Sequence, residues 1–311
     1  MIVDVHYHLF PWDFPDVAIK NVLWDVLKVA KLRGEEISME EGVKKARETW
    51  ADPTGERLLA SMEQDGIDFT VICATDTASI AAFTPELAQQ QNQTVARLAQ
   101  KHPDRMVALA GVDPRRKEGP EMLRQCFEEF GARGLKYHPD FGYDPSGPGS
   151  YKLLEILAEH NAVLLSHTGP LGPPSRGKFA EPILLADIGV DFPEIKVIAA
   201  HMGQINWRPW AVLASRQPSL YGDLAMWDEY AFGHYELFCR ELRDLIDIAG
   251  HSKVLFGTDN PVSSVGRPTG EWIQIIRDLP ANAPEAVTFT EEEVDAILGN
   301  NAASLLGIGG A

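Results

Sequence analysis

Residues 1–8 read MIVDVHYH, a short apolar run that ends in a pair of histidines. Short runs rich in branched apolar residues are typical of buried strands. Residues 1–5 supply the first run, and seven more follow along the chain, at residues 69–74, 106–112, 134–137, 163–166, 197–200, 220–224 and 254–256. The sequence therefore predicts eight strands.

Segments long enough for one helix each lie between many of these runs, and most show helical periodicity. They cover residues 86–101, 119–130, 150–161, 182–192 and 231–250. Strands that alternate with helices pair in parallel, and eight such units predict a (β/α)8 TIM barrel. We expect one domain over residues 1–311. A helical insertion after the first strand, about residues 12–60, could cover the pocket or serve as an oligomer contact.

The composition favours small-molecule chemistry. A formal net charge of -17 would repel the phosphates of nucleic acid and an anionic membrane surface, so we expect neither as a partner. The three cysteines are odd in number and widely spaced, which indicates core thiols in a reducing compartment rather than a disulfide framework. With no leader-like start and no apolar run of membrane-spanning length, we expect a cytoplasmic protein.

The first chemical signal is the pair His6 and His8. Residues two apart on a strand point to the same face, so both imidazoles can reach one ion. Such a pair occurs by chance often enough to be weak evidence alone, and two polar histidines at a strand end are the bland alternative.

Three more residues of types that bind metals lie at or just after the ends of later predicted strands. His167 ends the fifth run, His201 follows the sixth, and Asp259 comes shortly after the eighth. Taken singly, each is more often structural, but all would lie at the same rim, where barrel enzymes build active sites. Imidazoles and a carboxylate around an open position predict a divalent metal, with Zn²⁺ favoured and Mn²⁺, Fe²⁺ or Co²⁺ as options.

The fourth strand and a later loop add candidates for substrate binding. Lys136 is a carbamylated ligand between two metals, a free cation that pairs with an anionic substrate, or a buried lysine in a structural pair. His138, two residues on, binds substrate or caps its loop. Arg208 could bind a substrate carboxylate, although a solvated arginine is the commoner case. The expected partner is therefore a small-molecule substrate, and a carboxylated one if these residues bind it.

These residues resemble the amidohydrolase superfamily, in particular the amidohydrolase-related group that includes aminocarboxymuconate semialdehyde decarboxylase and gamma-resorcylate decarboxylase. The resemblance spans nearly the whole chain. It is carried by short segments at residues 4–8, 62–68, 166–167, 200–203, 256–259 and 297–306.

The resemblance implies roles for the matching positions. His6, His8, His167 and Asp259 would hold the metal, and His201 would be a catalytic acid or base. In binuclear members of the superfamily a carbamylated lysine of the fourth strand bridges two metals, and the histidine after the sixth strand binds the second metal. The matching residues here would be Lys136 and His201. A homodimer is a further option that the group suggests.

The leading hypothesis from the sequence is a metal-dependent hydrolase of an amide, lactone or ester bond. The metal would lower the pKa of a bound water to about 7, and Asp259 or His201 would take its proton. The alternative is a metal-dependent, non-oxidative decarboxylase of a small aromatic or unsaturated acid, in which His201 protonates the carbon that loses carbon dioxide. A metal-free binding protein on the same barrel is a third, less favoured hypothesis.

Overall fold

The computed structural model describes residues 1–11, 16–80, 83–173 and 175–309. Residues 12–15, where the predicted insertion begins, thus lie outside the described residues. The strands are β1 (Val3–His8), β2 (Phe69–Cys73), β3 (Met106–Gly111), β4 (Gly134–Tyr137), β5 (Val163–His167), β6 (Lys196–Ala200), β7 (Leu220–Asp223) and β8 (Val254–Leu255). Each of the eight predicted strands is confirmed to within three residues at either end.

The eight strands form one sheet in the order β1 to β8. The segment after β8 also bonds to β1, since the Val5 N–H donates to the Phe256 carbonyl and the Asp259 N–H donates to the His6 carbonyl. The fold is therefore a (β/α)8 TIM barrel, as the sequence predicts.

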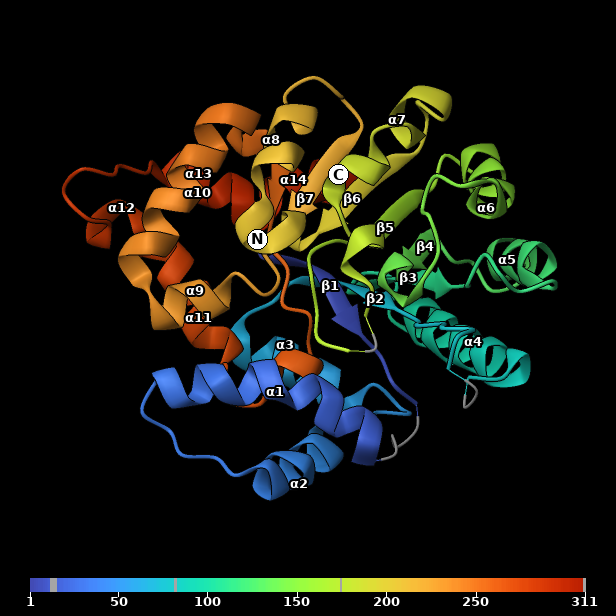
Figure 1. Cartoon of the computed structure of the whole chain (residues 1–311), viewed down its shortest axis with the longest axis horizontal. Coiled ribbons are helices and arrows are strands. Elements are labelled where there is room, and N and C mark those ends of the chain that lie inside the picture. Colours follow the sequence, from blue (N-terminus) through green and yellow to red (C-terminus); the bar gives the residue numbers. More distant parts are fainter. Residues whose placement is uncertain (12–15, 81–82, 174, 310–311) are drawn as a thin grey trace. The chain divides into compact units, whose positions relative to one another are not determined.

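Helices connect the strands and fill the segment after β1 (Figure 1). They are α1 (Asp16–Leu32), α2 (Met39–Thr49), α3 (Glu56–Asp65), α4 (Pro85–Lys101), α5 (Gly119–Glu128), α6 (Pro148–Glu159), α7 (Ile188–Asp191), α8 (Arg208–Ala214), α9 (Asp228–Gly233), α10 (Tyr235–Ala249), α11 (Thr269–Arg277), α12 (Leu279–Asn282), α13 (Glu291–Asp295) and α14 (Asn301–Leu306).

Two segments predicted to hold one helix each are broken in the structure. Residues 182–192 form a 3-10 turn, Pro182–Leu185, followed by α7, and the buried positions continue across the break. Residues 231–250 divide between α9 and α10 at His234, whose backbone is not helical. Periodicity misses such breaks, because both pieces bury the same face.

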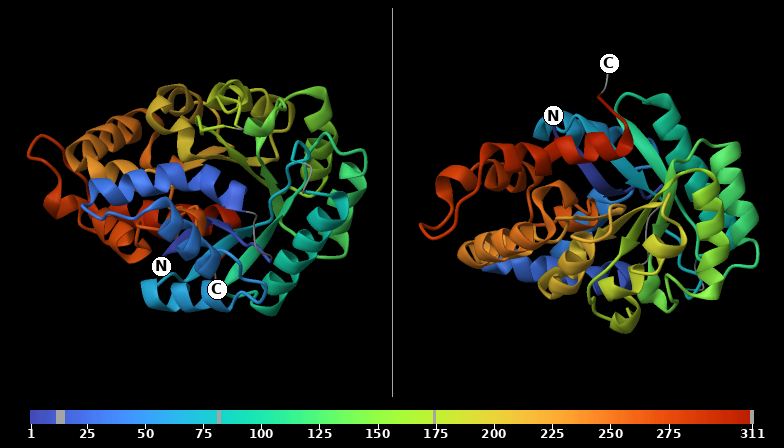
Figure 2. Two further views of the ribbon diagram at one scale, coloured as in Figure 1. Left: turned by 60° about the horizontal axis from the view of Figure 1, so that its bottom comes forward. Right: turned by 90° about the horizontal axis from the view of Figure 1, so that it is seen from above.

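Two compact units make up the chain. Unit 1 comprises Met1–Thr70 and Leu224–Ala311, and unit 2 comprises Val71–Asp223. In unit 1, α1 and α2 pack side by side (Figure 2). Ile19, Leu23 and Val26 of α1 are buried in an apolar cluster with residues of α2, and both helices lie in the predicted helical insertion.

The end of the chain packs against β1 within unit 1. A Cβ on Gly299 would lie 2.3 Å from the Met1 carbonyl oxygen, so only glycine allows this approach. The Asn301 side chain donates to the carbonyls of His251 and Val254. These contacts explain why the segment around residue 300 contains glycine and asparagine.

Unit 2 contains most of the parallel ladder, with α4, α5 and α6 along one side of β3 to β5 (Figure 1). In register, Lys136 of β4 pairs with Leu165 of β5, and Tyr137 pairs with Ser166. Gly134 of β4 is required by packing, because a Cβ there would lie 2.2 Å from the Val163 carbonyl oxygen.

All three cysteines are buried and free, which confirms the expected core thiols. Among the described residues, none of the helices combines the length and the apolar character that crossing a membrane would require.

Candidate metal centre

Three side chains of unit 1 converge at the carboxyl end of β1. Nε2 of His6 lies 3.2 Å from Nε2 of His8. Oδ1 of Asp259 lies 3.2 Å from the His6 nitrogen and 3.1 Å from the His8 nitrogen. Both histidines are buried, and the Asp259 side chain is 14% exposed. The three donor atoms thus form a nearly equilateral triangle, which we call the first cluster.

Backbone bonds place the members of the first cluster. Strand alternation puts His6 and His8 on the same face of β1. Asp259 is aligned with them because its N–H donates to the His6 carbonyl, while the His8 N–H donates to the Asn260 carbonyl. Asp259 has a φ of 57°, in the left-handed region that aspartate adopts more readily than most residues.

Asp4 ties β1 to the segment that carries Asp259. Its buried Oδ1 accepts hydrogen bonds from the backbone N–H groups of His6 at 3.0 Å and Thr258 at 3.1 Å. Its Oδ2 accepts the Thr258 hydroxyl at 2.6 Å. The Asp4 carboxylate therefore links the strand that carries His6 and His8 to the segment that carries Asp259.

The first cluster fits a divalent metal. Ligand atoms about 2.1 Å from one ion are about 3.4 Å apart in a tetrahedron, and about 3.0 Å apart at neighbouring corners of an octahedron. The observed separations of 3.1 and 3.2 Å lie between these values. Imidazole nitrogen and carboxylate oxygen suit Zn²⁺, Mn²⁺, Fe²⁺ and Co²⁺ alike.

A second cluster lies in unit 2 and contains His138, Asp140 and His167. One donor atom from each side chain lies within 4.8 Å of the other two. The rings of His138 and His167 stack with centroids 5.7 Å apart. Nε2 of His167 lies 3.1 Å from the Gly169 carbonyl, which makes this nitrogen the protonated one and leaves Nδ1 as the donor for a metal.

Asp140 is fully buried, and His138 Nδ1 lies 3.5 Å from its Oδ1. Burial alone would raise the pKa of this carboxyl group. The neighbouring imidazoles of His167 and His138 outweigh that effect and hold the pKa well below its ordinary value. Asp140 is therefore a buried carboxylate anion beside two imidazoles.

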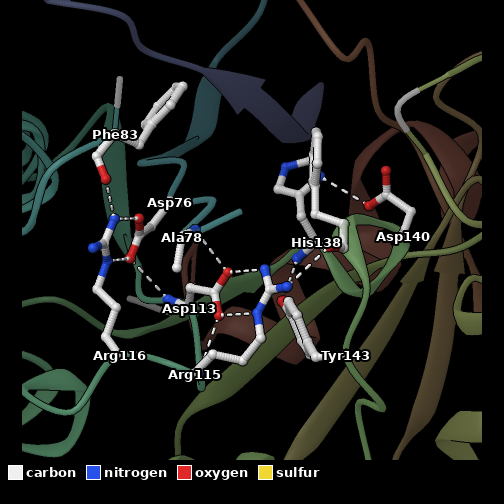
Figure 3. A network of polar contacts seen from close by, with 10 residues as sticks. Asp76, Ala78, Phe83, Asp113, Arg115, Arg116, His138, Asp140 and Tyr143 are labelled. Carbon is white, nitrogen blue, oxygen red and sulfur yellow. Dashed lines mark hydrogen bonds and ion pairs between the residues drawn. The ribbon is translucent and has the colours of Figure 1, made fainter. Parts of the chain in front are cut away.

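An ion-pair network braces the loop that carries His138 and Asp140, as Figure 3 shows. Arg115 pairs with Asp113 through two nitrogens and donates to the Phe141 carbonyl. Its guanidinium also lies 5.3 Å from the ring of Tyr143, whose hydroxyl accepts the backbone N–H of His138 at 2.7 Å. These contacts fix the backbone of the loop at His138 and Phe141.

His201 follows β6 and is buried. Its ring centroid lies 4.9 Å from that of His167. The backbone N–H of His201 donates to Asp223 Oδ1 at 2.9 Å, and its φ of 64° is left-handed. Such strained backbone is found where the surrounding structure fixes a residue for a role.

The predicted substrate-binding residues occupy different settings. Lys136 is buried within β4, two residues before His138. Arg208 begins α8 on the surface, and its guanidinium lies over the ring of Trp207 at 4.4 Å. His138 belongs to the second cluster. A role in substrate binding stays a prediction for all three.

The structure therefore brings His6, His8 and Asp259 together in unit 1, and it groups His138, His167 and His201 in unit 2. The four-ligand set with His167 stays a prediction. Sequence reasoning missed Asp4 and Asp140. Asp4 shares the strand face of His6 and His8, which was an available signal, whereas Asp140 follows His138 by two residues outside any strand.

Solved structures with the same fold include decarboxylases of aromatic acids. 5-Carboxyvanillate decarboxylase from Sphingomonas paucimobilis is 17% identical, with a TM-score of 0.65 over 99% of each chain. A dihydroxybenzoic acid decarboxylase from Polaromonas, with bound manganese and 2-nitroresorcinol, is 16% identical, with a TM-score of 0.67 over 100% of this chain and 98% of that one.

A third similar structure is 5-carboxyvanillate decarboxylase from Novosphingobium aromaticivorans, complexed with manganese and a nitrobenzoic acid. It is 16% identical, with a TM-score of 0.67 over 99% of this chain and 96% of that one. The sequence itself matches the amidohydrolase family model from residue 3 to residue 308. Because this match covers nearly the whole chain, the protein belongs to the amidohydrolase family.

Proposed function

We propose that the protein is a metal-dependent, non-oxidative decarboxylase of a small hydroxylated aromatic acid. The observation that carries the proposal is the triangle of His6, His8 and Asp259, whose spacing suits one divalent ion. Likeness to decarboxylases of carboxyvanillate and dihydroxybenzoate supports decarboxylation over the hydrolysis favoured by the sequence alone.

In this proposal His6, His8, His167 and Asp259 hold the ion. A bound divalent ion would act as a Lewis acid and neutralise the negative charge of the substrate. Zn²⁺ and Mn²⁺ both suit these donors, and two of the similar decarboxylases contain manganese. The brace from Asp4 keeps the ligands of the first cluster in place before any ion binds.

His201 is the proposed proton donor. Decarboxylation exchanges a carbon–carboxylate bond for a carbon–hydrogen bond, so the ring carbon must receive one proton. His201 as an imidazolium would deliver that proton to the carbon that bears the carboxylate. Carbon dioxide then leaves, and the electron pair of the broken bond restores the aromatic ring.

Lys136, His138 and Arg208 are the candidates for contact with the acid or hydroxyl groups of the substrate. A lysine ammonium or an arginine guanidinium pairs with a carboxylate, which is why Lys136 and Arg208 are candidates. His138 is a candidate for substrate contact because its ring stacks on that of His167, one of the proposed metal ligands.

The test is to load the protein with Mn²⁺ or Zn²⁺ and to supply two panels. One panel contains hydroxybenzoates such as 2,6-dihydroxybenzoate and 5-carboxyvanillate, and the other contains lactones, amides and esters. We expect carbon dioxide from the first panel and, in D2O, one deuterium at the carbon that loses the carboxylate. Acid release from the second panel without carbon dioxide from the first would establish hydrolysis instead.

His201→Asn provides the matched variant, because asparagine adopts the left-handed backbone of this position with little strain. Loss of a general acid lowers the rate by a factor of about 10² to 10⁴. The metal content of His201→Asn should equal that of the wild type, whereas His8→Ala should lose both metal and activity.

A further inference from the structure

A buried ion pair joins the segments that follow β7 and β8 in unit 1. Arg267 and Asp228 are both buried, and Nη1 of Arg267 lies 3.2 Å from Oδ1 of Asp228. Asp228 begins α9, whereas Arg267 lies beyond Asp259 on the segment that follows β8. Charged side chains are rarely buried unless they are paired, so each member of this pair holds the other in place.

Arg267 also fastens its own segment. Its Nε donates to the Ser263 carbonyl at 3.2 Å, and its Nη2 donates to the Ser263 hydroxyl. The Ser263 N–H in turn donates to the Asp259 carbonyl at 3.3 Å. Hydrogen bonds therefore connect the Arg267 guanidinium to the backbone of Asp259 through a single residue, Ser263.

We propose that Arg267 is a positioning residue for the metal ligand Asp259. The inference rests on the proposed role of Asp259 in holding the ion, and it adds a residue to which the proposed reaction gives no part. Arg267 acts through Ser263 on the backbone of the ligand, and Asp228 anchors the guanidinium from the segment after β7. Arginine suits this task better than lysine, because its planar fork presents several donors in fixed directions.

The backbone of Asp259 is held on both sides. Its φ of 57° is left-handed, and strain of this kind persists only where the surrounding structure fixes the residue. On the amino side, its N–H donates to the His6 carbonyl. On the carboxyl side, its carbonyl accepts the hydrogen bond from Ser263. The contacts of Arg267 with Ser263 therefore complete the support that β1 begins.

Apolar contacts with α1 hold the same segment independently of the ion pair. Val265 is buried in the apolar cluster that includes Leu23 and Val26 of α1. A Cβ on Gly266 would lie 2.8 Å from the Cβ of Ala30, which also belongs to α1. Because this packing remains when Arg267 is replaced, we expect a local shift of the segment rather than unfolding of unit 1.

The charge of the pair decides the pH of the experiment. Burial raises the pKa of the Asp228 carboxyl group to about 6, although the Arg267 guanidinium acts in the opposite direction. The negative charges of Glu229 and Asp259 add smaller contributions that raise this pKa. At pH 8 Asp228 is therefore ionised, and the pair with Arg267 is intact.

The experiment measures Co²⁺ binding to the full chain at pH 8. Competition with a chelator gives the affinity, and the visible absorption of Co²⁺ reports the geometry of its ligands. We expect Arg267→Met to bind Co²⁺ about 10–100-fold more weakly and with a changed spectrum. Arg267→Lys keeps the charge opposite Asp228 and should recover part of the affinity. Arg277→Met makes the same change at an exposed position of α11 and should equal the wild type.

Metal-free crystal structures give a readout that does not depend on metal binding. In the wild type, Oδ1 of Asp259 lies 3.2 Å from Nε2 of His6 and 3.1 Å from Nε2 of His8. We expect Asp259 to be displaced from this position in Arg267→Met. Wild-type protein that bound no metal would refute the proposed function, whereas the position of Asp259 in the variant would still decide the role of Arg267.

Three results would overturn the positioning role. They are an unchanged position of Asp259 in Arg267→Met, a Co²⁺ affinity equal to that of a metal-binding wild type, and a comparable loss of affinity in Arg277→Met. A thermal unfolding scan establishes that Arg267→Met folds. If it does not, Arg267→Met is combined with Asp228→Asn, which leaves no unpaired buried charge. The double variant lacks the contacts with Ser263, so the same displacement and weaker binding are expected, and wild-type behaviour would again overturn the role.

Discussion

Asp4 offers the sharpest test of how the first cluster is held. Its carboxylate accepts two backbone N–H groups, from His6 and Thr258, and the Thr258 hydroxyl. In Asp4→Ala the hydroxyl can turn toward the His6 carbonyl, from which it lies 3.4 Å away, but the two amides are left without an acceptor. Each buried donor without a partner costs about 1–3 kcal/mol, so we expect a loss of about 2–6 kcal/mol in the free energy of unfolding.

Asp4→Asn separates the hydrogen bonds from the charge. The amide oxygen can accept both backbone N–H groups, and the amide nitrogen can donate to the Thr258 hydroxyl. Neutral hydrogen bonds contribute about 0.5–1.5 kcal/mol each, against about 1.5–3 for those to a charged group, but removal of a buried charge offsets part of that difference. The asparagine variant should therefore lose less stability than the alanine variant.

Both variants should also bind the first ion more weakly. Residues that orient metal ligands from behind typically contribute a factor of about 10–100 in metal affinity. Urea unfolding without metal gives the stability, and competition with a chelator gives the affinity for Zn²⁺. An alanine variant within about 0.5 kcal/mol of wild type, the usual range for neutral surface changes, would refute the bracing role of Asp4.

Three further outcomes follow from the structure. Gly134→Ala should destabilise the protein by about 1–3 kcal/mol through overpacking against the Val163 carbonyl, whereas Gly172→Ala, with open space around it, should be nearly neutral in the same urea titration. Burial raises the pKa of Cys126 to about 12, so it should stay unreactive toward a thiol reagent at pH 8 until the protein is unfolded; rapid native labelling would contradict its burial. Removal of metal with a chelator should lower the melting temperature, because an ion at 100 times its dissociation constant stabilises the folded state by about 2.7 kcal/mol; an unchanged melting temperature would argue against metal binding.

The strands could be predicted from the sequence because most of their residues are apolar or buried, on both faces of the sheet. Gly134–Tyr137 was predicted to the residue for this reason. Helix breaks could not be predicted, since the buried positions of residues 182–192 continue across a break in the backbone. Local pattern reports burial, whereas the path of the backbone also depends on contacts with distant residues.

The sequence was sufficient to predict which residues could bind a metal, but not which of them lie next to one another. The spacing of His6 and His8 on one strand face gave their convergence directly. The pairing of β4 with β5 could not be read from the sequence, so Lys136 and His138 were equally eligible as neighbours of His167. Register decides between them, because Lys136 pairs with Leu165 and His138 falls beside His167.

The two clusters contain the same donor types, yet the chain prepares them differently. Backbone hydrogen bonds of β1 with Asp259 and Asn260 set the first cluster, and its donor atoms already have the spacing of bound ligands. In the second cluster His167 ends β5, whereas His138 and Asp140 lie in the segment after β4, and the donor atoms are spread over as much as 4.8 Å. An ion that needs less rearrangement binds more tightly. The first cluster should therefore bind its ion without a change in the rotamers of His6, His8 and Asp259, and a metal-loaded crystal structure in which one of these side chains had turned away would contradict this expectation.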